Sequence, residues 1–283
     1  MPALGIDIGG SSIKLALIDH HAPITIAASD HYNQPSPDQL TAHLARAATR
    51  LPIPPDITAI GICLPGIMAP DGIRIERSVN LPALQGTNLP DLIAHVTTSP
   101  APRRIFTDAH AAAFGYWSEH PLPDRLFALS LGTGVGACVL DNGQQLLVTA
   151  RSSGHFGQID VGPCDDPQPI GPDGGHNSLE AYIGLPALHA RYGSALAGHL
   201  TTLTAADPPL RALVRALRIA HAIYRPQHIA LLGGLGLQLA PHRDAIKAAV
   251  DEHLTCIADP AWSLHTAESS HHAAIGAARL ASA

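Results

Sequence analysis

Two glycine-rich turns are the parts of this sequence best suited to chemistry. The first is Asp7-Ile8-Gly9-Gly10-Ser11-Ser12-Ile13-Lys14, and the second is Gly132-Thr133-Gly134-Val135-Gly136. Glycine lets the backbone approach a phosphate closely, and N–H and hydroxyl groups can donate to its oxygens. Apolar runs flank each turn, which predicts a β-hairpin in both places. Both turns could therefore hold phosphate, with an ordinary hairpin turn as the alternative for each one alone.

Two aspartates accompany these turns. Asp7 could hold a water of a Mg²⁺ ion, because that ion keeps several waters and binds few carboxylates. Asp108 stands where a predicted strand changes into a helix. A carboxylate there could accept the proton of an attacking hydroxyl, as phosphoryl transfer requires. The alternative for Asp108 is a purely structural role as the N-cap of the helix.

Strands and helices alternate along the chain in a pattern that predicts an α/β fold. We expect strands near residues 3–8, 13–18, 57–64, 105–106, 126–131, 137–140 and 229–232. We expect helices near residues 38–50, 88–96, 109–117, 179–191, 209–224 and 271–282, and an irregular loop over 151–178. The order of strand, glycine-rich turn and strand occurs twice, which suggests an internal repeat. Gly233-Gly234 follows the last of these strands and suits close packing of an adenosine.

Composition narrows the class of protein. The 283 residues suffice for two domains, and 46% are hydrophobic. The net charge of −6 and the lack of a basic run argue against a nucleic-acid partner. The cysteines are scattered, which is typical of a protein in a reducing compartment. We find no evident signal peptide and no apolar run long enough to span a bilayer. We therefore expect a cytoplasmic protein without a membrane partner.

Seven motifs in order resemble the ROK family of repressors, open reading frames and sugar kinases. These motifs are Asp7-Ile8-Gly9-Gly10-Ser11, Leu64-Pro65-Gly66, Asn80-Leu81-Pro82, Asp108-Ala109, Gly132-Thr133-Gly134-Val135-Gly136, Ser178-Leu179-Glu180 and Leu232-Gly233-Gly234. The resemblance implies two actin/hexokinase-like (ribonuclease H-like) α/β domains around a nucleotide-binding cleft. It also implies phosphorylation of a sugar hydroxyl with ATP and Mg²⁺, and a homodimer. We expect the domains to be 1–107 and 108–283, with the last helix returning to the first.

The resemblance assigns roles to individual residues. Asp108 matches the catalytic aspartate. The first phosphate loop matches Asp7, Gly9, Gly10, Ser11, Ser12 and Lys14; the second matches Gly132, Thr133, Gly134 and Gly136; the adenosine motif matches Gly233 and Gly234. Residues expected to border the sugar are Pro65, Gly66, Asn80, Thr107, Asp108, His155, Gln158 and Glu180.

The sugar half departs from the family pattern. Thr107 replaces an asparagine, and His155 and Gln158 replace a sugar-binding glutamate and a histidine that also ligates zinc. The family's three cysteines fall on Gly171, Asp173 and Ser178, so we expect no zinc site. Glucose should consequently be a poor substrate.

Three alternatives to an ATP-dependent kinase remain open. Polyphosphate could be the donor, since glucokinases of the family that use it also lack the zinc cluster. A sugar- or nucleotide-binding regulator without activity is the second, although a first phosphate loop beginning by residue 7 leaves no room for a DNA-binding helix-turn-helix. An ATPase activator with an iron–sulfur cluster is the third, and no suitable cysteine pair supports it.

Overall fold

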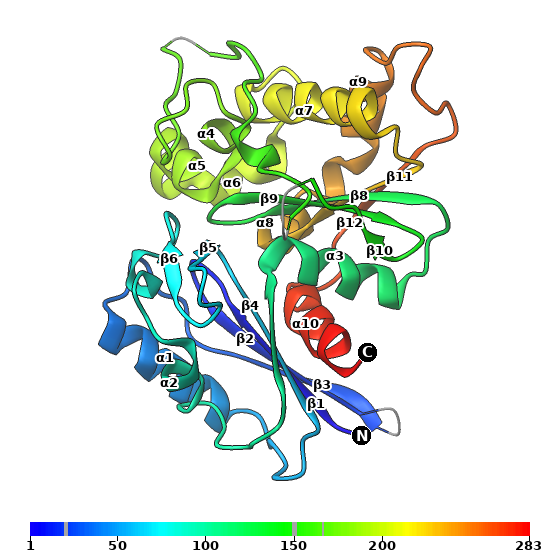
Figure 1. The fold of residues 1–283 in the computed structure, drawn as a ribbon. Coiled ribbons are helices and arrows are strands. Elements are labelled where there is room, and N and C mark those ends of the chain that lie inside the picture. The colour runs from blue at the N-terminus through cyan, green and yellow to red at the C-terminus, as the bar shows by residue number, and fades with distance from the viewer. Residues whose placement is uncertain (20–21, 149–151, 166) are drawn as a thin grey trace. The chain divides into compact units, whose positions relative to one another are not determined.

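Two α/β units make up the chain (Figure 1). The computed structural model describes residues 1–19, 22–148, 152–165 and 167–283. The first unit joins Met1–Ser118 to His271–Ala283, and the second unit covers Glu119–Ser270. Helix α3 (Asp108–Glu119) therefore lies almost wholly in the first unit. The domain boundary after residue 107 stays a prediction.

The first unit is built on a five-stranded sheet with the strand order β3-β2-β1-β4-β7. Its strands are β1 (Ala3–Ile8), β2 (Ile13–Asp19), β3 (Ala22–Ala28), β4 (Ala59–Leu64) and β7 (Arg103–Thr107). The first three are antiparallel neighbours, whereas β4 runs parallel to β1 and β7 runs parallel to β4. The carboxyl ends of β1, β4 and β7 therefore meet at one edge, which is where open α/β sheets bind ligands.

Helix α1 (Pro37–Thr49) covers one face of this sheet. It begins with a capping box, in which the Ser36 hydroxyl accepts from the Gln39 N–H and the Gln39 side chain accepts from the Ser36 N–H. Leu40 and Leu44 are buried in the core that α1 shares with the strands. Each such leucine contributes about 1.5–3 kcal/mol by leaving water.

Helix α10 (His272–Ser282) packs on the other face, against β1 and β4. Gly5 and Gly61 are paired neighbours on these two strands. A Cβ on Gly5 would lie 1.8 Å from the Ala274 carbonyl oxygen, and one on Gly61 would lie 1.9 Å from that of Ala277. Glycine at both positions is therefore what lets the C-terminal helix approach the sheet. The remaining elements of the unit are β5 (Ile67–Met68), β6 (Ile75–Arg77), the 3₁₀ turn Pro82–Leu84 and α2 (Leu89–Ile93).

The second unit repeats the plan of the first. Its sheet has the order β10-β9-β8-β11-β12, with β8 and β9 antiparallel and β11 parallel to β8. The strands are β8 (Arg125–Leu131), β9 (Val135–Asp141), β10 (Gln144–Gln145), β11 (His228–Leu232) and β12 (Ser263–Thr266). Each sheet thus carries one glycine-rich turn on its central hairpin, and the predicted internal repeat is confirmed.

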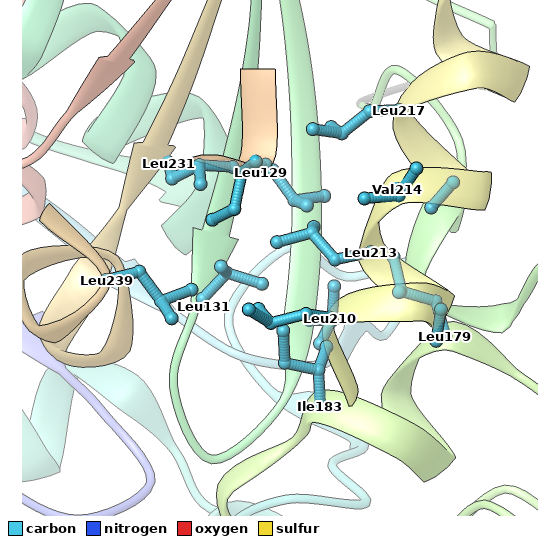
Figure 2. Close-up of a cluster of buried hydrophobic side chains, with 14 of the residues drawn as sticks. Leu129, Leu131, Leu179, Ile183, Leu210, Leu213, Val214, Leu217, Leu231 and Leu239 are labelled. Carbon is cyan, nitrogen blue, oxygen red and sulfur yellow. The ribbon is translucent and has the colours of Figure 1, made fainter. Parts of the chain in front are cut away.

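Helix α7 (Pro208–Tyr224) covers the core of the second unit (Figure 2). Leu210, Leu213 and Leu217 recur at helical spacing and are buried beside Leu129 and Leu131 of β8. The other helices are α4 (Leu179–Ile183), α5 (Leu185–Tyr192), α6 (Leu196–Thr202), α8 (Gly233–Gln238) and α9 (Arg243–Asp251), with 3₁₀ turns at Phe156–Gln158, Gly193–Ala195 and Ala240–His242. None of the helices in the described ranges is long and apolar enough to cross a bilayer.

Some elements differ from the sequence predictions. The single helix predicted over 179–191 is wrong: α4 ends at Ile183, and α5 begins at Leu185 after an extended Gly184. Pro186 lies in the first turn of α5, where its missing N–H costs nothing. Strand β3 was not predicted because Pro23 interrupts its apolar run, but β3 is an edge strand, where proline is tolerated.

Candidate active site

The predicted site residues divide between the two units. In the first unit, the turn between β1 and β2 brings Asp7 and Lys14 into register as direct partners. The Lys14 Nζ lies 3.6 Å from the Asp7 Oδ2, and the exposed fractions of the two side chains are 20% and 7%. The turn itself is closed by a hydrogen bond from the Gly9 N–H to the Ser12 carbonyl oxygen. A carboxylate and an ammonium are therefore held together beside the first glycine-rich turn.

Asp7 is a buried carboxyl group with two polar neighbours. Burial raises the pKa of Asp7, and the Lys14 ammonium opposes that shift. The Cys63 thiol lies on the adjacent strand in register with Asp7, and its Sγ donates to the Asp7 Oδ1 at 3.7 Å. Burial raises the pKa of Cys63 well above its ordinary value, so the thiol keeps its proton and acts as the donor. One carboxylate held this way fits the outer coordination shell of Mg²⁺.

Asp108 is the first residue of α3 and follows directly on β7. The cap of this helix is Thr107, whose hydroxyl oxygen accepts from the His110 N–H at 3.3 Å. The Asp108 carboxylate instead accepts from the N–H of its neighbour Ala109 at 2.8 Å. Thr107 therefore occupies the N-cap position that the structural alternative gave to Asp108, and the catalytic role of Asp108 stays a prediction.

The electrostatic surroundings of Asp108 suit a proton acceptor. Burial raises the pKa of Asp108, the Ala109 N–H opposes this, and the negative charge of Asp7 raises it further. A carboxylate with a raised pKa is a stronger base than an ordinary aspartate. Asp7 and Asp108 stand at the carboxyl ends of β1 and β7, so both belong to the same edge of the sheet.

The segment after β4 contributes the other predicted residues of this edge. Gly66 has a φ of 128°, and a Cβ there would lie 2.5 Å from the Arg77 carbonyl oxygen. The Pro65 carbonyl oxygen accepts from the Ser78 hydroxyl at 3.0 Å. Asn80 follows two residues later and is half-buried. Glycine at position 66 is thus a packing requirement of the turn, whether or not a sugar lies beside it.

The second glycine-rich turn joins β8 to β9 in the second unit. The Gly132 N–H donates to the Gly134 carbonyl oxygen at 3.0 Å, and the Gly132 carbonyl oxygen accepts from the Leu185 N–H at 2.9 Å. The Glu180 carboxylate accepts from the Val135 N–H at 2.6 Å. Glu180, which the sequence assigns to the sugar, is therefore also a support of this turn. Its contact with a sugar stays a prediction.

Gly233 and Gly234 lie next to this turn, since β11 runs beside β8. Gly233 has a φ of 81°, and a Cβ there would lie 2.4 Å from the Leu131 carbonyl oxygen. Within the described part of the chain, nothing would lie within 4 Å of a Cβ on Gly132 or on Gly234. Open space at these two glycines fits a ligand that approaches the backbone closely, as the phosphates and adenosine of ATP do.

Two predicted sugar residues of the second unit, His155 and Gln158, lie on the loop after β10. His155 precedes a short 3₁₀ turn and Gln158 ends it, and both side chains are exposed. Gly157 between them is buried, and a Cβ on it would lie 2.2 Å from the Val135 carbonyl oxygen. The loop is therefore seated on the start of β9, close to the second glycine-rich turn.

The three positions of the family's cysteines come together in space. A Cβ on Gly171 would lie 2.6 Å from the Asp173 Oδ1 and 2.7 Å from the Ser178 hydroxyl oxygen. Ser178 caps α4 by accepting from the Ala181 N–H, and Asp173 accepts from the Gly175 N–H. Within the described ranges, no group of three or more His, Cys, Asp or Glu side chains could hold a metal ion.

Hydrogen bonds organise the same loop. The Tyr182 hydroxyl donates to the Asn177 Oδ1 at 3.0 Å and accepts from the Cys164 N–H at 2.9 Å. The Asn177 Nδ2 in turn donates to Gln168 at 2.8 Å. Residues 151 and 166 of the predicted irregular loop lie outside the described residues.

Comparison with known proteins supplies the family. A sequence model of the ROK family matches residues 3–283. The chain belongs to the ROK family. An N-acetylmannosamine kinase from Salmonella paratyphi B is 29% identical over 170 residues, which are 58% of this chain and 55% of that kinase. The chain thus matches about half the length of this curated relative.

Solved structures of ROK proteins share the fold over the full chain. A ROK family glucokinase from Streptomyces griseus, in complex with glucose and AMPPNP, has a TM-score of 0.76 at 18% identity and covers 100% of this chain and 99% of its own. A ROK hexokinase from Thermus thermophilus has a TM-score of 0.70 at 21% identity, covering 100% and 98%. The predicted actin/hexokinase-like α/β fold is confirmed.

Two supporting residues of the site were not predicted. The Tyr32 hydroxyl donates to the Gly9 carbonyl oxygen at 2.5 Å and so holds the first turn. Tyr32 lies 23 residues away and carries no local signal of this contact. The position of Cys63 beside Asp7, by contrast, follows from parallel pairing of two predicted strands.

Proposed function

We propose that this ROK protein is an ATP-dependent sugar kinase in which Asp108 is the general base. The observation that carries the proposal is the half-buried Asp108 carboxylate at the carboxyl edge of the sheet, with the N-cap position of the helix occupied by Thr107. Asp108 accepts the proton of the sugar hydroxyl as that oxygen attacks the γ-phosphorus and the bond to the β-phosphate oxygen breaks. ADP and the sugar phosphate leave, and Asp108 returns its proton to water.

The two glycine-rich turns and Lys14 hold the β- and γ-phosphates in this proposal. Backbone N–H groups of both turns donate to phosphate oxygens, and the Lys14 ammonium adds a positive charge. Asp7 would hold a water of the Mg²⁺ ion bound with the nucleotide, and that ion would neutralise phosphate charge. Gly233 and Gly234 lie beside the adenosine in this proposal, and the open space at Gly234 leaves room for it.

The substrate we propose is a hexose or an amino-hexose derivative. N-acetylmannosamine is the first candidate, because kinases named for it share sequence with this chain. Asn80, His155 and Glu180 would bind its hydroxyl and acetamido groups by neutral and charged hydrogen bonds. Glucose should be a poorer substrate, because the imidazole of His155 stands where the family pattern has a glutamate whose carboxylate binds sugar hydroxyls. We also expect a homodimer, which light scattering of the purified chain would detect.

A coupled assay of ADP release tests the reaction. N-acetylmannosamine, N-acetylglucosamine, mannose and glucose would be screened with ATP and Mg²⁺, and formation of sugar phosphate with polyphosphate as the donor would be followed in parallel. We expect ATP-dependent turnover with at least one sugar. Turnover with polyphosphate but not with ATP would show that polyphosphate, and not ATP, is the phosphoryl donor. Saturable sugar binding without turnover with either donor would contradict the kinase proposal and favour a regulator.

A further inference from the structure

The outer face of helix α7 presents three arginines. Arg211, Arg215 and Arg218 are spaced four and three residues apart, so they lie on one side of the helix, and all three are exposed. The opposite side of α7 is the one packed in the core (Figure 2). The arginines line a groove of about 670 Å³, which is the size of a small-molecule site. The proposed kinase mechanism uses no part of this groove.

The groove is positively charged on an acidic protein. The chain has a net charge of −6, yet the groove sets three arginines against one carboxylate, that of Glu252. His253 also lines it. A local excess of guanidinium groups favours an anion, and the planar fork of arginine matches phosphate in particular.

Two of the arginines are fixed by hydrogen bonds to the backbone. Arg211 donates to the Cys164 carbonyl oxygen at 3.3 Å, and Arg215 donates to the Pro163 carbonyl oxygen at 2.9 Å. A guanidinium has five N–H donors, so each retains donors for a ligand. Arg218 makes no hydrogen bond or ion pair with the part of the chain that the structure describes. The groove therefore combines two positioned cations with one whose donors are all available.

A smaller cavity of about 130 Å³ adjoins the groove and shares Arg218 and Leu254 with it. His221 lines this cavity, and its side chain is 2% exposed. Neither ring nitrogen of His221 has a hydrogen-bond partner among the described residues, although the ring packs against Trp262. Buried polar groups normally have partners, so the two ring nitrogens of this imidazole stand out as unsatisfied donors or acceptors beside the cavity.

The groove is also lined by apolar side chains, which are those of Val214 on α7, Ala249 on α9 and Leu254 after α9. A ligand that fits must carry an anionic group for the arginines and a small body with a hydroxyl for the cavity at His221. We propose that this groove binds a phosphate monoester of a small polyol, with its phosphate on Arg211, Arg215 and Arg218 and its body directed toward His221. The site lies wholly within the second unit.

Calorimetric titration of the full chain tests the site at fixed ionic strength, with glycerol 3-phosphate and inorganic phosphate as probes. Arg218→Ala should weaken glycerol 3-phosphate at least about tenfold, since several charge-assisted hydrogen bonds are lost. Arg218→Lys should retain part of the affinity. The matched control is Arg46→Ala, which removes an exposed arginine from helix α1 and should change nothing. Phosphate bound at the proposed kinase site would persist in Arg218→Ala, so the test does not depend on kinase activity.

The outcomes separate the sources of phosphate. Tighter binding of glycerol 3-phosphate than of inorganic phosphate supports a monoester as the ligand. Equal affinities for the two probes, with both affinities lost in Arg218→Ala, would overturn the monoester proposal and assign the groove to free phosphate. His221→Phe keeps the aromatic ring against Trp262 and should weaken only the ester. Unchanged ester affinity in that variant would overturn the orientation toward His221. Unchanged affinity in Arg218→Ala, or no binding of either probe at millimolar concentration, would overturn the site.

Discussion

The carboxylate of Glu180 accepts a 2.6 Å hydrogen bond from the backbone N–H of Val135, which lies 45 residues earlier in the chain. This bond ties the start of helix α4 to the turn that we propose binds ATP. Glu180→Ala should therefore weaken ATP binding and cost about 1.5–3 kcal/mol of stability, as expected for a hydrogen bond to a charged group. Glu180→Gln keeps an acceptor and should lose less.

Nucleotide calorimetry and thermal unfolding of both variants would test this role. A role confined to the sugar would raise KM for the sugar in both variants and leave ATP affinity unchanged. That result would contradict the assignment of Glu180 as a support of the phosphate loop.

Gly132 offers a test of the second glycine-rich turn. A Cβ there meets no protein atom, so Gly132→Ala should fold normally but place a methyl group where a phosphate would approach. ATP affinity should fall about tenfold or more, which corresponds to about 1.4 kcal/mol. Gly198→Ala is the matched control, because a Cβ at that site in helix α6 also meets open space. Equal ATP affinity in the two variants would make the turn structural only.

Tyr182 tests how the loop before helix α4 is held. Its hydroxyl bonds both Asn177 and the Cys164 N–H, and Tyr182→Phe would leave both without that partner. We expect a loss of about 1–3 kcal/mol in the free energy of unfolding. Tyr192→Phe is the control, since Tyr192 stacks on His199 and its hydroxyl has no hydrogen bond within the described ranges. Equal unfolding curves for the two variants would show that the Tyr182 network is not needed.

The same loop should contain no zinc. Gly171, Asp173 and Ser178 lie together where the family's cysteines fall, and they offer one carboxylate and one hydroxyl in place of three thiolates. Elemental analysis of tag-free protein should find no stoichiometric zinc, and treatment with a chelator should leave the melting temperature unchanged. One zinc per chain would contradict this expectation.

Local signals in the sequence were sufficient for the hairpins and for the residues at their turns. The run from Asp7 to Lys14 predicted both the turn and its flanking strands, because glycine and alternating apolar residues act over a few positions. The strand–helix junction at Asp108 was predictable for the same reason. These elements contain most residues assigned to the nucleotide and the base.

Contacts between distant segments could not be read from the sequence. The bond from Val135 to Glu180 and that from Tyr32 to Gly9 depend on tertiary packing and leave no periodic pattern. The requirement for glycine at positions 5 and 61 comes from the packing of α10, which is distant in the sequence, so no local pattern indicates it. Strand β12 and helix α9 were not predicted, and both depend on packing within the second unit.

Asp108 should give the proposed kinase activity a distinct pH dependence. Its pKa is raised above the ordinary value of 3.8 by burial and by the charge of Asp7, so the acid limb of kcat/KM should have its midpoint above 3.8. The ionised form also destabilises the fold, because stability present below the ordinary pKa is lost as pH rises through the folded pKa. Asp108→Asn should therefore melt at a higher temperature than the wild type at pH 7, with the difference shrinking toward pH 3.8. A lower melting temperature for Asp108→Asn at pH 7 would contradict the burial argument.

The turnover number of Asp108→Asn is the sharpest test of Asp108 as the general base. It would be measured beside Asp56→Asn, a control with the same change at an exposed position. Loss of a positioned general base lowers rates by about 10²–10⁴-fold, so kcat with the best sugar should fall by that factor while ATP affinity stays near that of the wild type. Asp56→Asn should retain full activity. A kcat for Asp108→Asn within about twofold of the wild type would contradict the account, because no proton would then pass to Asp108 in the rate-determining chemistry.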